Sequence, residues 1–163
     1  MEPIALAQKM ELEGKAYYEK LAAETTAPEL KGVFTFLAGE EQKHYDLFKS
    51  MAFEEPAPPS AEEDAALGKM VEEVFSRLTA SFTFPEVVYD YQAAYGKALE
   101  MEREAVRFYT EIEAKAEASD RKAVRFIIGQ EKMHARLIES LIEFTKNPKT
   151  WLENSEWRTI ASY

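Results

Sequence analysis

Hydrophobic residues recur with a helical period in four stretches of this chain. In the first, apolar or small residues occupy positions 4, 7, 10, 14, 17, 18 and 21, which predicts a helix from residue 4 to about residue 23. A second stripe follows Pro28, which suits the first turn of a helix, and it ends before the prolines of residues 53–60. The third ends within residues 115–119. The fourth, with Ser119 as its predicted N-cap, ends near residue 147.

Sequence motifs of the first two predicted helices are repeated in the last two. Residues 10–21, "MELEGKAYYEKL", match residues 101–112, "MEREAVRFYTEI". In the same way, residues 39–48, "GEEQKHYDLF", match residues 129–138, "GQEKMHARLI". A repeat of this kind indicates that the chain contains two related structural units, each made of two helices.

The repeat and the short turns inside each unit predict how the helices are joined. We predict one bundle domain, residues 1–147, made of two helical hairpins, residues 3–52 and 84–147. Residues 53–83 are predicted to form the crossover and to carry a short extra helix, and residues 148–163 form a C-terminal tail. The predicted fold is therefore an all-α four-helix bundle with one long crossover.

Composition and charge narrow the classes of function. The 163 residues contain no cysteine, which excludes disulfides, thiol catalysis and Cys-ligated metal sites and fits a cytoplasmic protein. The formal charge of -10 argues against a nucleic-acid partner, because such proteins normally present a basic surface. No membrane span or signal peptide is expected, since no long apolar window occurs and the first turns are acidic.

Acidic residues and both histidines of the chain interrupt the apolar stripes at matching places. The first and third helices each carry one inward glutamate, whereas Glu13 and Glu104 lie on the polar faces. The second and fourth helices each carry a Glu-x-x-His pair, whose spacing projects both side chains to one side of the helix. These inward residues are Glu11, Glu41, His44, Glu102, Glu131 and His134.

Four carboxylates gathered in an apolar interior require neutralisation. Each unpaired buried carboxylate would cost several kcal/mol of lost hydration. Two divalent cations would balance four negative charges, and bridging carboxylates can hold two metals together. Oxygen-rich ligands with one imidazole per metal suit iron best, with manganese and zinc as alternatives. We therefore predict a centre of two metal ions.

These motifs resemble the ferritin-like di-iron carboxylate proteins, and within them the rubrerythrin-like branch. The resemblance covers roughly residues 4–146 and rests on "MELEGKAYY", "GEEQKHYDLF", "MEREAVRFY" and "GQEKMHARL". It implies that the six inward residues bind the two metals. The chain departs from rubrerythrins in lacking the four cysteines of their second iron domain. It also has Ala105 where they tend to place another carboxylate, and Glu104 is the neighbour that could lean in to replace it.

Other residues near the predicted ligands have two readings each. Tyr18 and Tyr109 follow the inward glutamates by two helical turns, so they either hydrogen-bond to a ligand and relay electrons, or pack in the core. Gly14 either allows close packing or leaves room for dioxygen or peroxide. Gly39 and Gly129 precede the Glu-x-x-His pairs, and we expect close helix contact at both.

The leading functional hypothesis is a redox enzyme that reduces peroxide or dioxygen at a di-iron centre. Its electrons would come from a separate, rubredoxin-like donor protein, since the chain itself has no cysteine. The resemblance implies a homodimer, while the charge and the lack of a long apolar window argue against a nucleic-acid or membrane partner. One alternative is an iron-binding protein that oxidises Fe(II) for storage. Another is a structural bundle in which metal binding only contributes folding energy.

Overall fold

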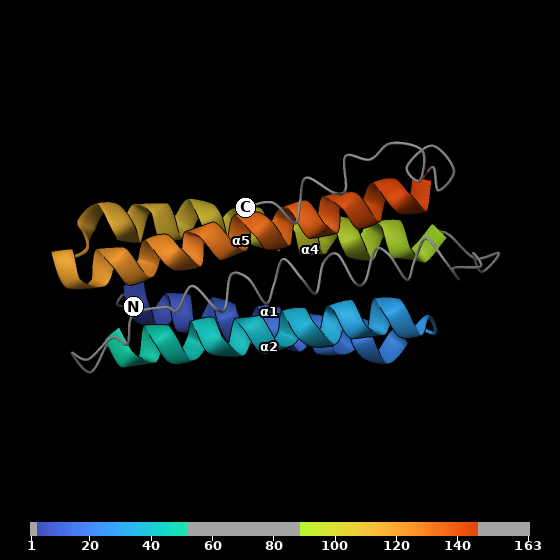
Figure 1. Cartoon of the computed structure of the whole chain (residues 1–163), viewed down its shortest axis with the longest axis horizontal. Coiled ribbons are helices and arrows are strands. Elements are labelled where there is room, and N and C mark those ends of the chain that lie inside the picture. Colours follow the sequence, from blue (N-terminus) through green and yellow to red (C-terminus); the bar gives the residue numbers. More distant parts are fainter. Residues whose placement is uncertain (1–2, 52–88, 147–163) are drawn as a thin grey trace.

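The computed structural model describes residues 3–51 and 89–146, which form four α-helices. The helices are α1 (Pro3–Glu24), α2 (Pro28–Met51), α4 (Tyr89–Lys115) and α5 (Ala118–Lys146). Figure 1 shows α1 beside α2 as one hairpin and α4 beside α5 as the other, with the two hairpins packed against each other. The contact between the hairpins is made mainly by α1 and α4. The all-α bundle predicted from the sequence is confirmed.

The helix boundaries follow local rules at most ends. As predicted, α2 begins at Pro28, whose lack of an N–H costs nothing in a first turn. The predicted cap at Ser119 is wrong, because α5 already begins at Ala118. The backbone N–H of Arg121 donates to the carbonyl of Glu117 at 2.9 Å, so the helical bonds begin before the serine. Only residues 116–117 separate α4 from α5.

The apolar core consists of two clusters. One contains the buried residues of α1 from Tyr18 onward and the buried residues of α2 between positions 30 and 38. The other contains Ala7 of α1, Phe48 of α2 and their neighbours on α4 and α5. On every helix the predicted ligands fall between the residues of the two clusters. A polar layer therefore divides the core across the middle of the bundle.

Two glycines differ from their sequence-based expectation. Gly39 and Gly129 are exposed, and a Cβ atom built on either would meet nothing within 4 Å. The prediction of close helix contact at these positions is wrong, because both lie on outer faces of their helices. The two glycines occupy equivalent positions of the two hairpins, but neither position is a helix contact.

Some predicted features lie outside the residues that the structure describes. They are the crossover at residues 53–83 with its short helix, the first residues of the predicted third helix and the tail at residues 148–163. Within the four helices that are described, none combines the length and apolar character needed to cross a membrane.

Candidate metal centre

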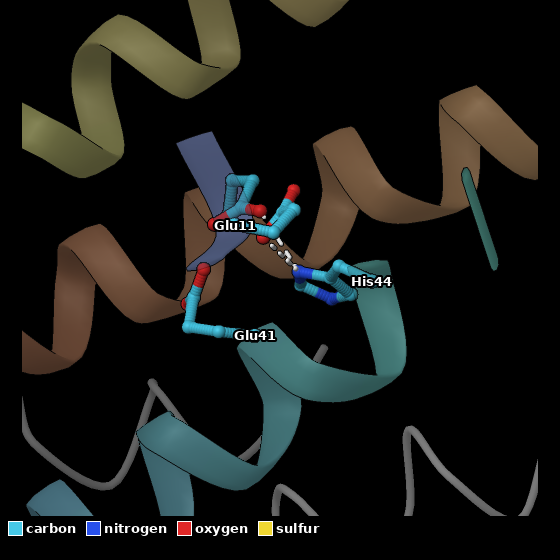
Figure 2. A group of neighbouring side chains, drawn as sticks. Glu11, Glu41 and His44 are labelled. Carbon is cyan, nitrogen blue, oxygen red and sulfur yellow. Dashed lines mark ion pairs between the residues drawn. The ribbon is translucent and has the colours of Figure 1, made fainter. Parts of the chain in front are cut away.

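All six predicted ligands meet in the polar layer of the bundle. α1 and α4 contribute one glutamate each, and α2 and α5 contribute one Glu-x-x-His pair each. No more than 5% of the surface of any of the six residues is exposed. Figure 2 shows three of them, Glu11, Glu41 and His44, pointing toward one another from α1 and α2. The i, i+3 spacing explains why a glutamate and a histidine of one helix face the same point.

The ligand atoms form two overlapping groups. Within each group, the ligand atoms all lie within 4.8 Å of one another. Both groups include Glu41 and Glu131, and each adds one further glutamate and one histidine. Glu11 and His44 complete the first group, and Glu102 and His134 complete the second. Two cation positions that share two carboxylates are the arrangement that bridging ligands provide.

Both imidazole rings turn the same nitrogen toward the carboxylates. His44 Nδ1 lies 2.9 Å from Glu131 Oε1 and 3.5 Å from Glu11 Oε2. His134 Nδ1 lies 3.3 Å from the other oxygen of Glu131 and 3.4 Å from Glu41 Oε1. The two rings are stacked, with centroids 5.5 Å apart. Glu131 thus lies between the two histidines, and Nδ1 is the nitrogen available to a metal on each.

Unsatisfied polar atoms concentrate at the same place. In the described part of the chain, nine buried side-chain oxygen or nitrogen atoms have no hydrogen-bond partner, and all but the Tyr95 hydroxyl belong to the ligand set. They include both carboxylate oxygens of Glu11 and of Glu131 and the Nδ1 atom of each histidine, whose close contacts with Glu131 are charge pairs and not hydrogen bonds. Buried polar groups are rarely left unpaired unless they bind an ion or a water. The donor set therefore fits a pair of metal ions.

The pKa values show which side chains of the centre carry protons when no cation is bound. Burial, reinforced by the charge of Glu131, raises the pKa of Glu102 to about 8 and that of Glu41 well above its usual value. Burial alone would lower the pKa of His44 and His134, but the surrounding carboxylates outweigh it and raise both. Burial would raise the pKa of Glu131, yet the two histidines lower it. Protons therefore occupy the centre in place of metal, and the two compete.

Two tyrosines lie near the single inward glutamates of the opposite hairpins. The Tyr18 hydroxyl of α1 donates a hydrogen bond to Glu102 Oε1 of α4. Burial and then the charge of the nearby Glu11 raise the pKa of Tyr109. Both tyrosines are also buried members of the core clusters. For Tyr18, core packing and a hydrogen bond to a predicted ligand therefore occur together, whereas for Tyr109 the structure shows core packing.

Gln130 is a further buried residue beside the six predicted ligands, and the sequence pattern did not single it out. Its Oε1 atom lies 3.0 Å from His44 Nε2, across the two hairpins, and the residue is 2% exposed. Such a bond fixes the ring orientation and leaves Nδ1 for the metal. Gln130 precedes Glu131 and lies four residues before His134, so it shares their inward stripe. That position was the available clue.

A small cavity of about 110 Å³ lies beside the centre, and Gly14 and Ala105 are among the residues that line it. A Cβ atom on Gly14 would lie 3.0 Å from Glu41 Oε2, so the absence of a side chain leaves space for this carboxylate. Glu104 does not replace the missing carboxylate in the centre, because its side chain is 57% exposed and pairs with Arg107 at 3.5 Å.

Comparison with known proteins agrees with the geometry. The family model described as Rubrerythrin matches residues 2–142, which include all six residues of the metal centre. Neither a curated protein nor a solved structure matched the chain. The family is one of ferritin-like bundles that bind two metals, typically iron, and the buried cluster of carboxylates and histidines is suited to this. The chain belongs to the rubrerythrin family.

Proposed function

We propose that this protein is a redox enzyme that reduces peroxide or dioxygen at a di-iron centre with electrons from a separate protein. The observation that carries the proposal is the pair of overlapping ligand groups that share Glu41 and Glu131. A bound pair of iron ions supplies one electron from each ion, and two electrons are what the reduction of peroxide to water requires.

The charges of the ligand set match two divalent cations. Four ionised glutamates balance four positive charges, and neutral histidines add donors without adding charge. The set is rich in oxygen and has one imidazole for each position, which favours iron or manganese over a structural zinc. Burial of all six residues strengthens these interactions, because little water screens them.

The protein supplies hydrogen bonds that orient the side chains around this centre. Burial and the neighbouring Glu102 raise the pKa of Tyr18 well above its usual value, so its hydroxyl stays protonated at neutral pH. It therefore acts as a hydrogen-bond donor that fixes one oxygen of Glu102. Gln130 fixes the ring of His44 as an acceptor, because its Oε1 atom lies 3.0 Å from Nε2. Such contacts decide which lone pairs remain for a metal.

The proposed electron source lies outside these residues. A Cys-ligated iron site cannot form within a sequence that has no cysteine. We therefore assign the supply of electrons to a rubredoxin-like donor. The cavity beside Gly14 and Ala105, at about 110 Å³, has room for a molecule of the size of peroxide or dioxygen next to Glu41.

A single-turnover experiment tests the proposal. Iron-loaded, reduced protein is prepared anaerobically and then mixed with one equivalent of either hydrogen peroxide or dioxygen. Mössbauer spectroscopy measures how many iron ions per protein are oxidised. We expect rapid oxidation of two irons for each peroxide consumed. Iron that stays reduced with both oxidants would contradict the proposal and indicate a structural role. Continued oxidation of excess Fe(II), with iron retained in a closed shell, would indicate storage instead.

A further inference from the structure

The cavity beside the centre is built from equivalent positions of the two sequence repeats. It lies between α1 and α4, the two helices that join the hairpins. Glu13 and Glu104 are equivalent and both line it, as are Gly14 and Ala105. Glu41 and Glu102, two residues of the ligand set, complete the inner part of the lining. The cavity therefore connects positions outside the centre with the centre itself.

Carboxylates line this cavity from its solvent-exposed rim to its buried inner end. The side chains of Glu13 and Glu104 are 62% and 57% exposed, whereas Glu41 and Glu102 are 5% and 3% exposed as residues. Glu41 reaches from the cavity into the centre: its Oε2 atom is the one nearest Gly14, and its Oε1 atom, 3.4 Å from His134 Nδ1, is buried without a hydrogen-bond partner among the described residues. An acidic rim alone would be an ordinary solvated surface. Its continuation to an unpartnered buried carboxylate points to a positively charged ligand.

The walls of the cavity are small where they face Glu41. Gly14 has no side chain, and the nearest oxygen of Glu41 would be only 3.0 Å from a Cβ at this position. Ala105, its counterpart in the other hairpin, carries a single methyl group. Larger residues at these two positions would close the space between the rim and the ligands.

We propose that this opening between α1 and α4 is the port by which divalent cations reach the centre, and that Glu13 and Glu104 form its outer binding point. The proposal rests on the metal centre proposed above. Glu13 pairs with Lys9 and Glu104 with Arg107, each at 3.5 Å between exposed groups. Such pairs are weak, so a doubly charged ion competes with them effectively. The net charge of -10 favours the approach of cations.

The rate of metal uptake tests the port separately from the chemistry of the centre. Metal-free protein is mixed with Co²⁺ in a stopped-flow instrument, and the visible bands of bound Co²⁺ report uptake. For the double variant Glu13→Gln/Glu104→Gln, we expect the association rate constant to fall about tenfold at low ionic strength. Its dependence on ionic strength should weaken as well. The amount of Co²⁺ bound at equilibrium should equal that of the unmodified protein.

A charge-matched control removes two other exposed glutamates from the same helices. Neither Glu24 of α1 nor Glu111 of α4 lines the cavity. The variant Glu24→Gln/Glu111→Gln should therefore take up Co²⁺ within about twofold of the original rate, because it changes only the overall charge. A further variant, Ala105→Leu, should slow uptake without any change of charge, since it narrows the opening.

The possible results separate the port from the centre. Equal uptake rates in the rim variant and its control, with full binding in both, would overturn the port and leave the metal centre standing. Unslowed uptake by Ala105→Leu would also overturn it. A lower amount of bound Co²⁺ in the rim variant would show that Glu13 and Glu104 are ligands and overturn their role as an outer point. Absence of Co²⁺ binding by the unmodified protein would overturn both proposals.

Discussion

The hydroxyl of Tyr18 in the first hairpin donates a hydrogen bond to Glu102 in the second. Burial and then the charge of Glu11 in the first hairpin raise the pKa of Tyr109 in the second. Each hairpin thus places a tyrosine near the single inward glutamate of the other. Because the hydrogen bond of Tyr18 crosses the interface between α1 and α4, the polar layer contributes to the alignment of the hairpins.

The substitution Tyr18→Phe should destabilise the metal-free protein. It leaves a buried carboxyl group without its donor, which costs about 1–3 kcal/mol in the free energy of unfolding. Tyr95→Phe is the matched control, because the Tyr95 hydroxyl is buried with no hydrogen-bond partner among the described residues. Its removal should leave stability unchanged or raise it by about 1 kcal/mol. Urea unfolding checks both, and equal losses would contradict the assigned role of Tyr18.

The substitution Gln130→Leu should weaken metal binding without removing a ligand. The His44 ring loses the partner of its Nε2 atom, so its Nδ1 atom is no longer held toward the centre. Loss of such a supporting contact typically lowers metal affinity by about 10–100-fold. Competition with a chromophoric chelator measures the affinity. Gln42→Leu, on the outside of α2 where Gln42 pairs with Lys15, serves as the control and should bind metal normally.

Much of this centre could be predicted from the sequence, because a helix places residues by simple periodicity. The inward direction of Glu11 and Glu102, and the exposure of Glu13, follow from their places on or off an apolar stripe. The repeat then doubled each observation. The bundle fold followed from the same stripes and from the short turn within each hairpin.

Contacts between helices were harder to predict, because periodicity gives the inward face and not the partner on it. The bond between His44 and Gln130 joins two hairpins whose relative rotation no local pattern encodes. The expectation at Gly39 was wrong for a related reason, since a glycine indicates close approach only if another helix lies on that side. The cap at Ser119 failed because the turn before α5 is shorter than the pattern suggested.

The glycines of the bundle should respond to substitution in opposite ways. In Gly14→Ala, the new Cβ would lie 3.0 Å from Glu41 Oε2, so this carboxylate must move. We expect metal affinity to fall about tenfold, as for other disturbed ligand orientations. Gly39→Ala meets nothing within 4 Å and should raise the free energy of unfolding by about 1 kcal/mol while metal affinity is unchanged. Reduced affinity in both variants would show that the Gly14 contact is not the cause.

Stability should depend on pH in opposite senses with and without metal. The pKa of Glu102 is about 8 in the folded protein, against 4.5 for the unperturbed group. In metal-free protein its stabilising contribution is complete below pH 4.5 and is lost as the pH rises toward 8. The raised pKa values of Glu41 and both histidines act in the same direction. The free energy of unfolding should fall by about 1 kcal/mol per pH unit for each such group.

Bound metal reverses this trend, because it replaces the protons of the centre. The gap in melting temperature between metal-loaded and metal-free protein should therefore widen from pH 5 to pH 8. Near pH 7 we expect a gap of about 10 °C for metal well above its dissociation constant. Thermal unfolding followed by circular dichroism, with and without a chelator, measures it. Parallel curves for the two forms would contradict the competition between metal and protons.

The most direct test of the central claim is the number of iron ions bound per chain after anaerobic loading, measured by elemental analysis. The structure predicts two ions for the unmodified protein, because its ligand atoms form two groups. Glu41→Ala should lower this number, since Glu41 belongs to both groups, and Glu13→Ala should leave it unchanged at equilibrium. An unmodified protein that binds no iron, or an equal loss in Glu13→Ala, would contradict the account.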